Sequence, residues 1–249
     1  DVNKIIWSAL GWNPDADLNM VLREYCRLFF GADLVDAAAA GIFALERNWE
    51  GALATNGAVD ATHTLWSALD ERHPELRTNW RWQLCLLRAN YDLYIRRRLR
   101  YETDIEKETN RHMLTARSQG SDKAIAGALN ALKQADTHVS PELRERVINL
   151  CDDLWRSIGL QTSVTKYQAS GYERGAVLDF LDYPLNNRWW LEDELAKVQA
   201  MPDEAARTAR LEEIARWEDP SPGSFYDDIG NVTKSPPEVR NERRAAPIL

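Results

Sequence analysis

The sequence predicts an all-α protein: a bundle or array of about seven to nine helices with an extended N-terminus and a coil-rich C-terminal tail. Between residues 15 and 217, apolar residues recur three and four positions apart, and Gly and Pro separate these runs. Only residues 5–7 and 177–185 look extended. We therefore expect a remnant of a preceding domain or linker at 1–14, a helical domain at 15–217 and an extended tail at 218–249.

The bounds of the first helices are predicted from N-cap residues and from the Gly and Pro residues that end helices. Asp15 or Asp17 caps a run of apolar residues that stops before Gly31. An Ala-rich second helix covers about 33–49, and a third covers 59–72. The longest run extends from 75 to about 118 and would span roughly 60 Å as one helix, so we expect a bend or break after Tyr101.

The remaining helices are expected at 121–137, 141–168, 187–200 and 202–217. After Trp217 the sequence becomes rich in Pro, Gly and Asp and loses its periodicity, which is typical of coil.

Composition excludes several classes of function. The chain has 249 residues and a formal net charge of −8, and nucleic-acid binding needs a basic face, so we expect no nucleic-acid partner. No run of about 18 apolar residues occurs, so we expect no membrane span. Cys26, Cys85 and Cys151 are too few and too scattered for a disulfide framework, and they are interpreted as buried apolar residues.

Ten tryptophans are the most unusual feature of the composition. Most of them lie in helical runs and are expected to fill gaps between helices: Trp49, Trp66, Trp80, Trp82, Trp155 and Trp217. Trp7, Trp12, Trp189 and Trp190 lie near the ends of elements, where an indole ring could pack or could stack on the face of a sugar.

No recognisable catalytic motif, metal-ligand spacing or cofactor loop occurs, so we expect no catalytic residue, metal or cofactor. The segment 173–194 is the least generic part of the interior. There, charged and amide side chains stand beside aromatic residues: Glu173, Arg174, Asn186, Asn187 and Arg188. They form either a polar lock between helices or a ligand-facing patch.

Three stretches carry a resemblance to a known group of enzymes. They are NKIIWSALGWNPDAD…LREYCRLFFG, LERNWEG and FYDDIGN. The first resembles the junction that follows the last strand of a (β/α)8 barrel in bacterial glycoside hydrolases of the hexosaminidase-like or α-glucuronidase-like kind. The clear resemblance covers about the first 50 residues.

The resemblance implies that residues 5–7 are the remnant of the final barrel strand and that Trp7, Trp12 and Asn13 lie near a sugar-binding rim. Arg188, Trp189 and Trp190 are the other candidate sugar-binding residues. Because the acid and nucleophile of such enzymes lie on strands that this chain lacks, the resemblance implies an inactive accessory domain. It also implies a secreted or periplasmic location.

The leading hypothesis is therefore a non-catalytic helical accessory domain of a larger glycoside hydrolase-like protein. Its partners would be the catalytic barrel of the parent chain, carbohydrate, or a second copy in a homodimer. One alternative is a free-standing helical module that binds a protein. Another is an all-α enzyme that uses the Asp, Glu and Arg side chains of 173–194.

Overall fold

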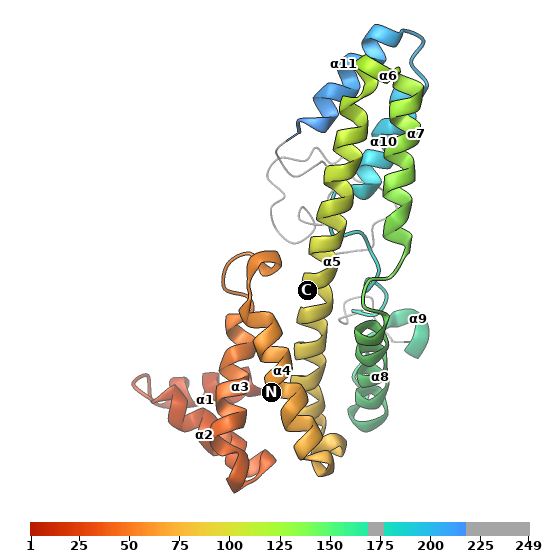
Figure 1. Ribbon diagram of the computed structural model, residues 1–249. Coiled ribbons are helices and arrows are strands. Elements are labelled where there is room, and N and C mark those ends of the chain that lie inside the picture. Colours follow the sequence, from red (N-terminus) through yellow and green to blue (C-terminus); the bar gives the residue numbers. More distant parts are fainter. Residues whose placement is uncertain (169–176, 218–249) are drawn as a thin grey trace. The chain divides into compact units, whose positions relative to one another are not determined.

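The structure, a computed structural model, describes residues 1–168 and 177–217 (Figure 1). This part of the chain forms eleven α-helices and four short 3-10 segments, and it contains no strand. The helices are α1 (Val2–Trp12), α2 (Leu18–Phe30), α3 (Val35–Arg47), α4 (Ala58–Arg72), α5 (Trp80–Leu114), α6 (Ala116–Gln119), α7 (Ser121–Leu132), α8 (Pro141–Ile158), α9 (Val164–Tyr167), α10 (Arg188–Gln199) and α11 (Glu204–Ala215). The all-α prediction is confirmed. The coil predicted for 218–249 lies outside the described residues.

The prediction of an extended N-terminus is wrong, because residues 2–12 form α1. The β-branched pair at 5 and 6 favours a strand locally, but the wider pattern of apolar residues at 2, 5, 6, 9 and 10 has helical spacing. Val2 and Ile5 pack against the hydrophobic core beside α2, and this contact favours the helical spacing over the local preference.

The described part of the chain divides into two compact units. Unit 1 comprises residues 1–96 and 140–160, and unit 2 comprises 97–139 and the chain from 161 onward. The helix α5 supplies residues to both units. The break expected after Tyr101 in the run 75–118 comes at Thr115, which separates α5 from α6. The 35 residues of α5 itself contain no Gly or Pro and form one continuous helix.

The core of unit 1 is built around two tryptophans on α4 and α5. Trp66 and Trp82 have no exposed surface, and their rings meet edge to face with centroids 5.1 Å apart. The indole of Trp66 donates to the carbonyl of Gly41 at 3.1 Å, so α3 approaches α4 closely at that glycine. Both tryptophans therefore fill gaps between helices as predicted.

The core of unit 2 joins the second part of α5 to α7, α10 and α11. Its most buried residues are Met113, Ala128, Leu195, Val198 and Leu211. Because α10 and α11 lie beside α7, the segment that precedes α10 is brought to the polar face of α5 within the same unit.

The buried positions expected for the cysteines are confirmed, since Cys26, Cys85 and Cys151 are all buried, and none of the three forms a disulfide. The prediction for Trp49 and Trp217 is wrong, because they are 52% and 43% exposed. Both lie just beyond the last residue of a helix, outside the regular helical spacing that places side chains on a buried face.

Candidate functional site

Each unit carries one candidate site, and in unit 1 it is the outer surface of α1. None of the eleven residues of this helix is buried, although seven of them are apolar. Trp7 is 79% exposed and Trp12 is 94% exposed. A helix that is apolar on most sides is normally covered. The exposed surface of α1 is therefore suited to binding another molecule.

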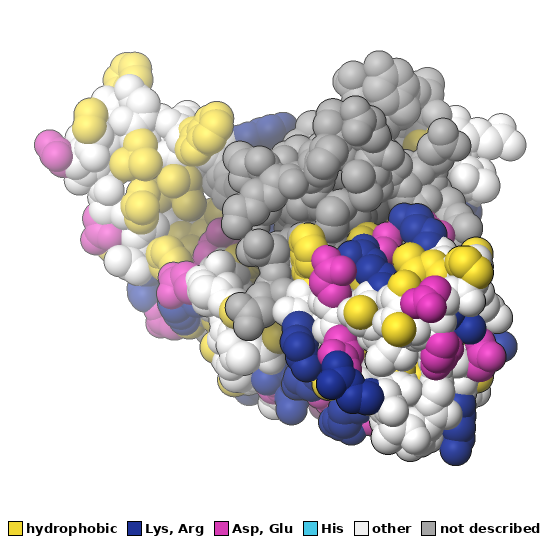
Figure 2. All heavy atoms as spheres, turned by 90° about the horizontal axis from the view of Figure 1, so that it is seen from above, with side chains coloured by type: hydrophobic (Ala, Val, Ile, Leu, Met, Phe, Trp, Pro, Cys, Tyr) yellow, Lys and Arg dark blue, Asp and Glu magenta, His cyan; other side chains and the backbone are white. Residues whose placement is uncertain are grey.

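Two large apolar side chains of α2 are also exposed, Met20 at 55% and Leu28 at 75%. Figure 2 shows hydrophobic side chains gathered on the left-hand part of the surface, where α1 and α2 lie. Asn13, the third residue predicted in this region, follows α1 and accepts a hydrogen bond from the Asp15 amide at 3.1 Å. Its side chain therefore shapes the turn into α2.

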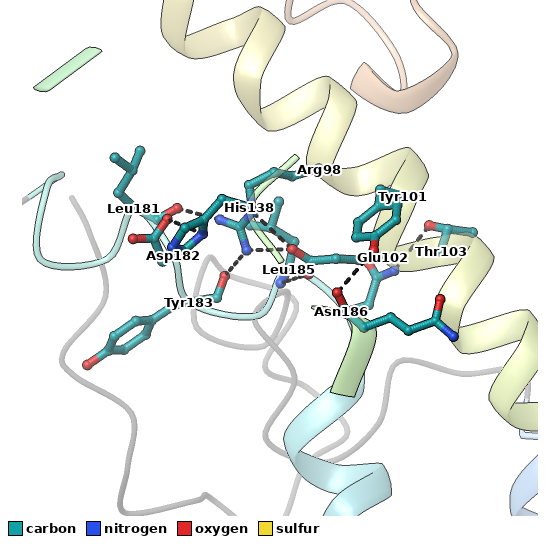
Figure 3. A network of polar contacts seen from close by, with 11 residues as sticks. Arg98, Tyr101, Glu102, Thr103, His138, Leu181, Asp182, Tyr183, Leu185 and Asn186 are labelled. Carbon is teal, nitrogen blue, oxygen red and sulfur yellow. Dashed lines mark hydrogen bonds and ion pairs between the residues drawn. The ribbon is translucent and has the colours of Figure 1, made fainter. Parts of the chain in front are cut away.

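The candidate site of unit 2 begins with an irregular segment, residues 177–187, that is held by side chains of α5. The guanidinium of Arg98 donates to the carbonyls of Leu181 and Tyr183 and to the carboxylate of Glu102. Glu102 in turn accepts from the amide of Leu185 at 2.8 Å (Figure 3). Backbone groups that would otherwise lack partners are thus satisfied by two charged side chains, which are only 7% and 10% exposed.

Two amide side chains extend this attachment toward α10. The Asn186 amide lies 3.1 Å from the hydroxyl of Thr103, and the Asn187 amide donates to Glu106 at 2.8 Å. These contacts support the polar-lock interpretation of this segment. Glu173 and Arg174, the other residues of that prediction, lie outside the described residues.

A polar cavity of about 150 Å³ lies beside this segment. Its lining includes one aromatic ring, three carboxylates, one imidazole and two guanidinium groups: Tyr101, Glu102, Asp136, Asp182, His138, Arg98 and Arg188. Figure 3 shows His138 directed toward Asp182, with 3.6 Å between Nδ1 and Oδ1. All of these residues belong to unit 2.

Arg188 is the predicted site residue that lines this cavity. Its guanidinium donates to Asp136 at 2.7 Å and to Glu192 at 2.9 Å. Burial alone would lower the pKa of Arg188, but its hydrogen bonds to these two carboxylates outweigh burial and raise the pKa. Arg188 therefore stays charged at the edge of the cavity.

The two neighbouring tryptophans have other roles. The Trp189 ring meets Tyr183 at a centroid distance of 5.2 Å, and the Trp190 ring meets Trp217 at 5.7 Å. Trp190 also packs against the core of unit 2. Neither ring lines the polar cavity. Of the six predicted site residues, Trp7, Trp12 and Asn13 thus belong to unit 1, and Arg188, Trp189 and Trp190 belong to unit 2.

Sequence reasoning missed most of the polar cavity. Arg98 and Glu102 were visible only as a charge pair at helical i, i+4 spacing, which usually lies on a solvated surface. His138 and Asp182 are 44 positions apart in sequence, so no local pattern connects them.

Within the described residues, no cluster of three or more His, Cys, Asp or Glu side chains has the arrangement of a metal site. No helix in that part of the chain is both long enough and apolar enough to cross a bilayer. Comparison with family models, curated proteins and solved structures found no match to this chain.

Proposed function

We propose that this chain is a non-catalytic helical accessory module that binds a partner protein or domain through the surface of α1. The observation that carries the proposal is the exposure of Trp7 and Trp12 on a helix with no buried residue. Large exposed apolar patches on folded proteins mark surfaces that bind other molecules. Tryptophan is also among the residues that contribute most to protein–protein binding energy.

The charges near this surface are of both signs. Lys4 is exposed on α1, and Asp15 and Asp17 are exposed after Trp12. The complementary surface would be an apolar groove that is bordered by side chains of the opposite charge at each of these positions.

A catalytic barrel of a glycoside hydrolase-like protein is one specific candidate for this partner, and it follows from the resemblance alone. Residues 5–7 are helical, so they do not form the barrel strand that the resemblance implies. The proposal therefore rests on the exposed surface of α1 and applies equally to a partner on a separate chain.

Photo-crosslinking tests where the partner binds. We would replace Trp7 by p-benzoylphenylalanine in the full chain and, as a matched control, place the same group at Leu114, which is 44% exposed in unit 2. The proposal predicts one defined adduct from position 7 and none from position 114. The adduct would be identified by mass spectrometry and its protein purified for binding measurements.

Binding measurements then test the energetics. Trp7→Ser and Trp12→Ser should each weaken the Kd for the purified partner by about 30-fold, which corresponds to ~2 kcal/mol. Leu114→Ser should leave the Kd unchanged. The melting temperature should stay the same in all three variants, because these side chains are exposed.

Three results would contradict the proposal. The first is equal crosslinking from positions 7 and 114, and the second is binding that is insensitive to both tryptophan substitutions. The third is saturable quenching of fluorescence by chitin or xylan oligomers that is lost in Trp7→Ser, because this result would make α1 a sugar-stacking surface instead.

A further inference from the structure

Three acid–base pairs face the polar cavity of unit 2. They are Arg98 with Glu102, Arg188 with Asp136, and His138 with Asp182. In each pair a hydrogen-bond donor lies beside an acceptor. The cavity wall therefore places a donor beside an acceptor at three positions.

The first pair is a fixed part of the wall. Arg98 and Glu102 are at least nine-tenths buried, and their polar atoms are committed to each other and to the backbone of 181–185. A wall that is held this firmly needs little reorganisation when a ligand binds.

The other two pairs provide groups that can reach a ligand. Arg188 uses Nε and Nη2 for its two carboxylate partners, whereas its Nη1 donates to none of the described residues. The side chain of His138 is 46% exposed, and its contact with Asp182 runs through Nδ1, which leaves Nε2 directed elsewhere. Thr137 adds an exposed hydroxyl to the lining.

The charges of the wall select against ions. Among the described residues of the lining, two arginines face three carboxylates. An anion would meet Glu102, Asp136 and Asp182, and a cation would meet two guanidinium groups, so either ion would face like charge. An uncharged molecule avoids this repulsion and can still use donors and acceptors on every side.

The volume and the one aromatic ring define the ligand further. A cavity of 150 Å³ is smaller than the ~300–1,000 Å³ typical of sites for drug-sized ligands. Tyr101 donates its hydroxyl to the Gln134 carbonyl at 3.0 Å, which fixes its ring at the wall. Such a ring can pack against the C–H groups of a ligand while the hydroxyls of the same ligand face the polar side chains.

We propose that this cavity binds a small uncharged polyhydroxyl molecule of monosaccharide size. Each hydroxyl of such a molecule both donates and accepts, which matches the alternating pairs of the wall. This inference is independent of the docking surface proposed for α1, because every residue that it uses belongs to unit 2.

Isothermal titration calorimetry of the full chain tests the proposal with glucose, xylose and N-acetylglucosamine as neutral probes. Sodium glucuronate and sodium sulfate serve as anionic probes, and choline chloride as a cationic probe. For a ligand with so few atoms, we expect a Kd of the order of a millimolar for at least one neutral sugar. The ions should bind at least tenfold more weakly.

Two variants locate the binding. Arg188→Gln and His138→Gln should each weaken the Kd of the neutral sugar at least tenfold. The control, Arg117→Gln, should leave it unchanged, because Arg117 is 76% exposed and lies outside the cavity. His138→Gln is informative even if Arg188→Gln unfolds the protein, since the His138 side chain is half exposed.

Three outcomes would overturn the proposal. The first is that no neutral sugar shows saturable binding, even at sugar concentrations well above a millimolar. The second is tighter binding of the anions or choline than of the neutral sugars. The third is sugar binding that Arg117→Gln weakens as much as the cavity variants do. Failure of these titrations would leave the crosslinking test of α1 unaffected, so the two proposals can be judged separately.

Discussion

Replacing Arg98 by Met should strongly destabilise the attachment of residues 181–185 to α5. The substitution keeps an unbranched side chain but removes the guanidinium that donates to the carbonyls of Leu181 and Tyr183. It also leaves Glu102 as a buried carboxylate without its main counter-charge. Removing one partner of a buried ion pair typically costs about 3–5 kcal/mol, which corresponds to a melting temperature lower by roughly 10 °C.

The amide of Leu185 provides a local assay, because it donates to Glu102 in the folded protein. Its hydrogen exchange, measured by NMR, should become faster in Arg98→Met. The control, Arg117→Met, removes the ion pair of the exposed Arg117 with Glu212. It should lower the free energy of unfolding by at most about 1 kcal/mol. The double variant Arg98→Met/Glu102→Leu should be less destabilised than Arg98→Met, because it leaves no unpaired buried charge.

The prediction would be refuted if Arg98→Met lowered the free energy of unfolding no more than Arg117→Met does. It would also fail if exchange at Leu185 were unchanged while the whole protein melted earlier, since the loss would then not arise at this attachment.

Two further predictions concern the close approach of α3 to α4 at Gly41 and the buried carboxylate of Asp92. Gly41→Ala places a methyl group 3.0 Å from the fully buried ring of Trp66, and overpacking of ~1–3 kcal/mol should outweigh the ~1 kcal/mol gain in helix propensity. Thermal unfolding should therefore show a loss of stability, whereas Gly11→Ala, whose methyl group meets nothing within 4 Å, should be neutral or stabilising; equal effects would contradict this. Burial raises the pKa of Asp92 above its ordinary value of 3.8 despite the nearby charge of Arg88, so the folded state binds the proton more tightly than the unfolded state. Urea titrations should show the wild type losing stability relative to Asp92→Asn as the pH rises from about 4 through the raised pKa, and a difference that does not vary with pH would refute the shift.

Much of the helical architecture could be predicted because it depends on local signals. Asp17 accepts a hydrogen bond from the Asn19 amide at 2.9 Å, as expected of an N-cap, and Gly31 ends α2 with a φ of 106°. The helix α1 was missed because its β-branched residues favour a strand locally, whereas its contacts with α2 favour a helix.

The division into units and the polar cavity depend on contacts between distant residues, and local signals do not report them. Arg98 binds carbonyls 83 and 85 positions away, and nothing in its own neighbourhood indicates these partners. Arg188 was singled out because it stands beside aromatic and amide side chains, but its position at a cavity depends on a loop 52 positions earlier.

The order of the units along the chain affects how the protein can be made and divided. Unit 1 is interrupted by residues 97–139 and is completed only by α8, and the boundary at 96–97 falls within the continuous helix α5. On a ribosome, unit 1 therefore cannot close until residue 160 has emerged, by which time the first part of unit 2 is already exposed and still lacks α10 and α11. Neither unit is one continuous stretch of the chain, so no single cut yields two fragments that each hold one unit and nothing of the other.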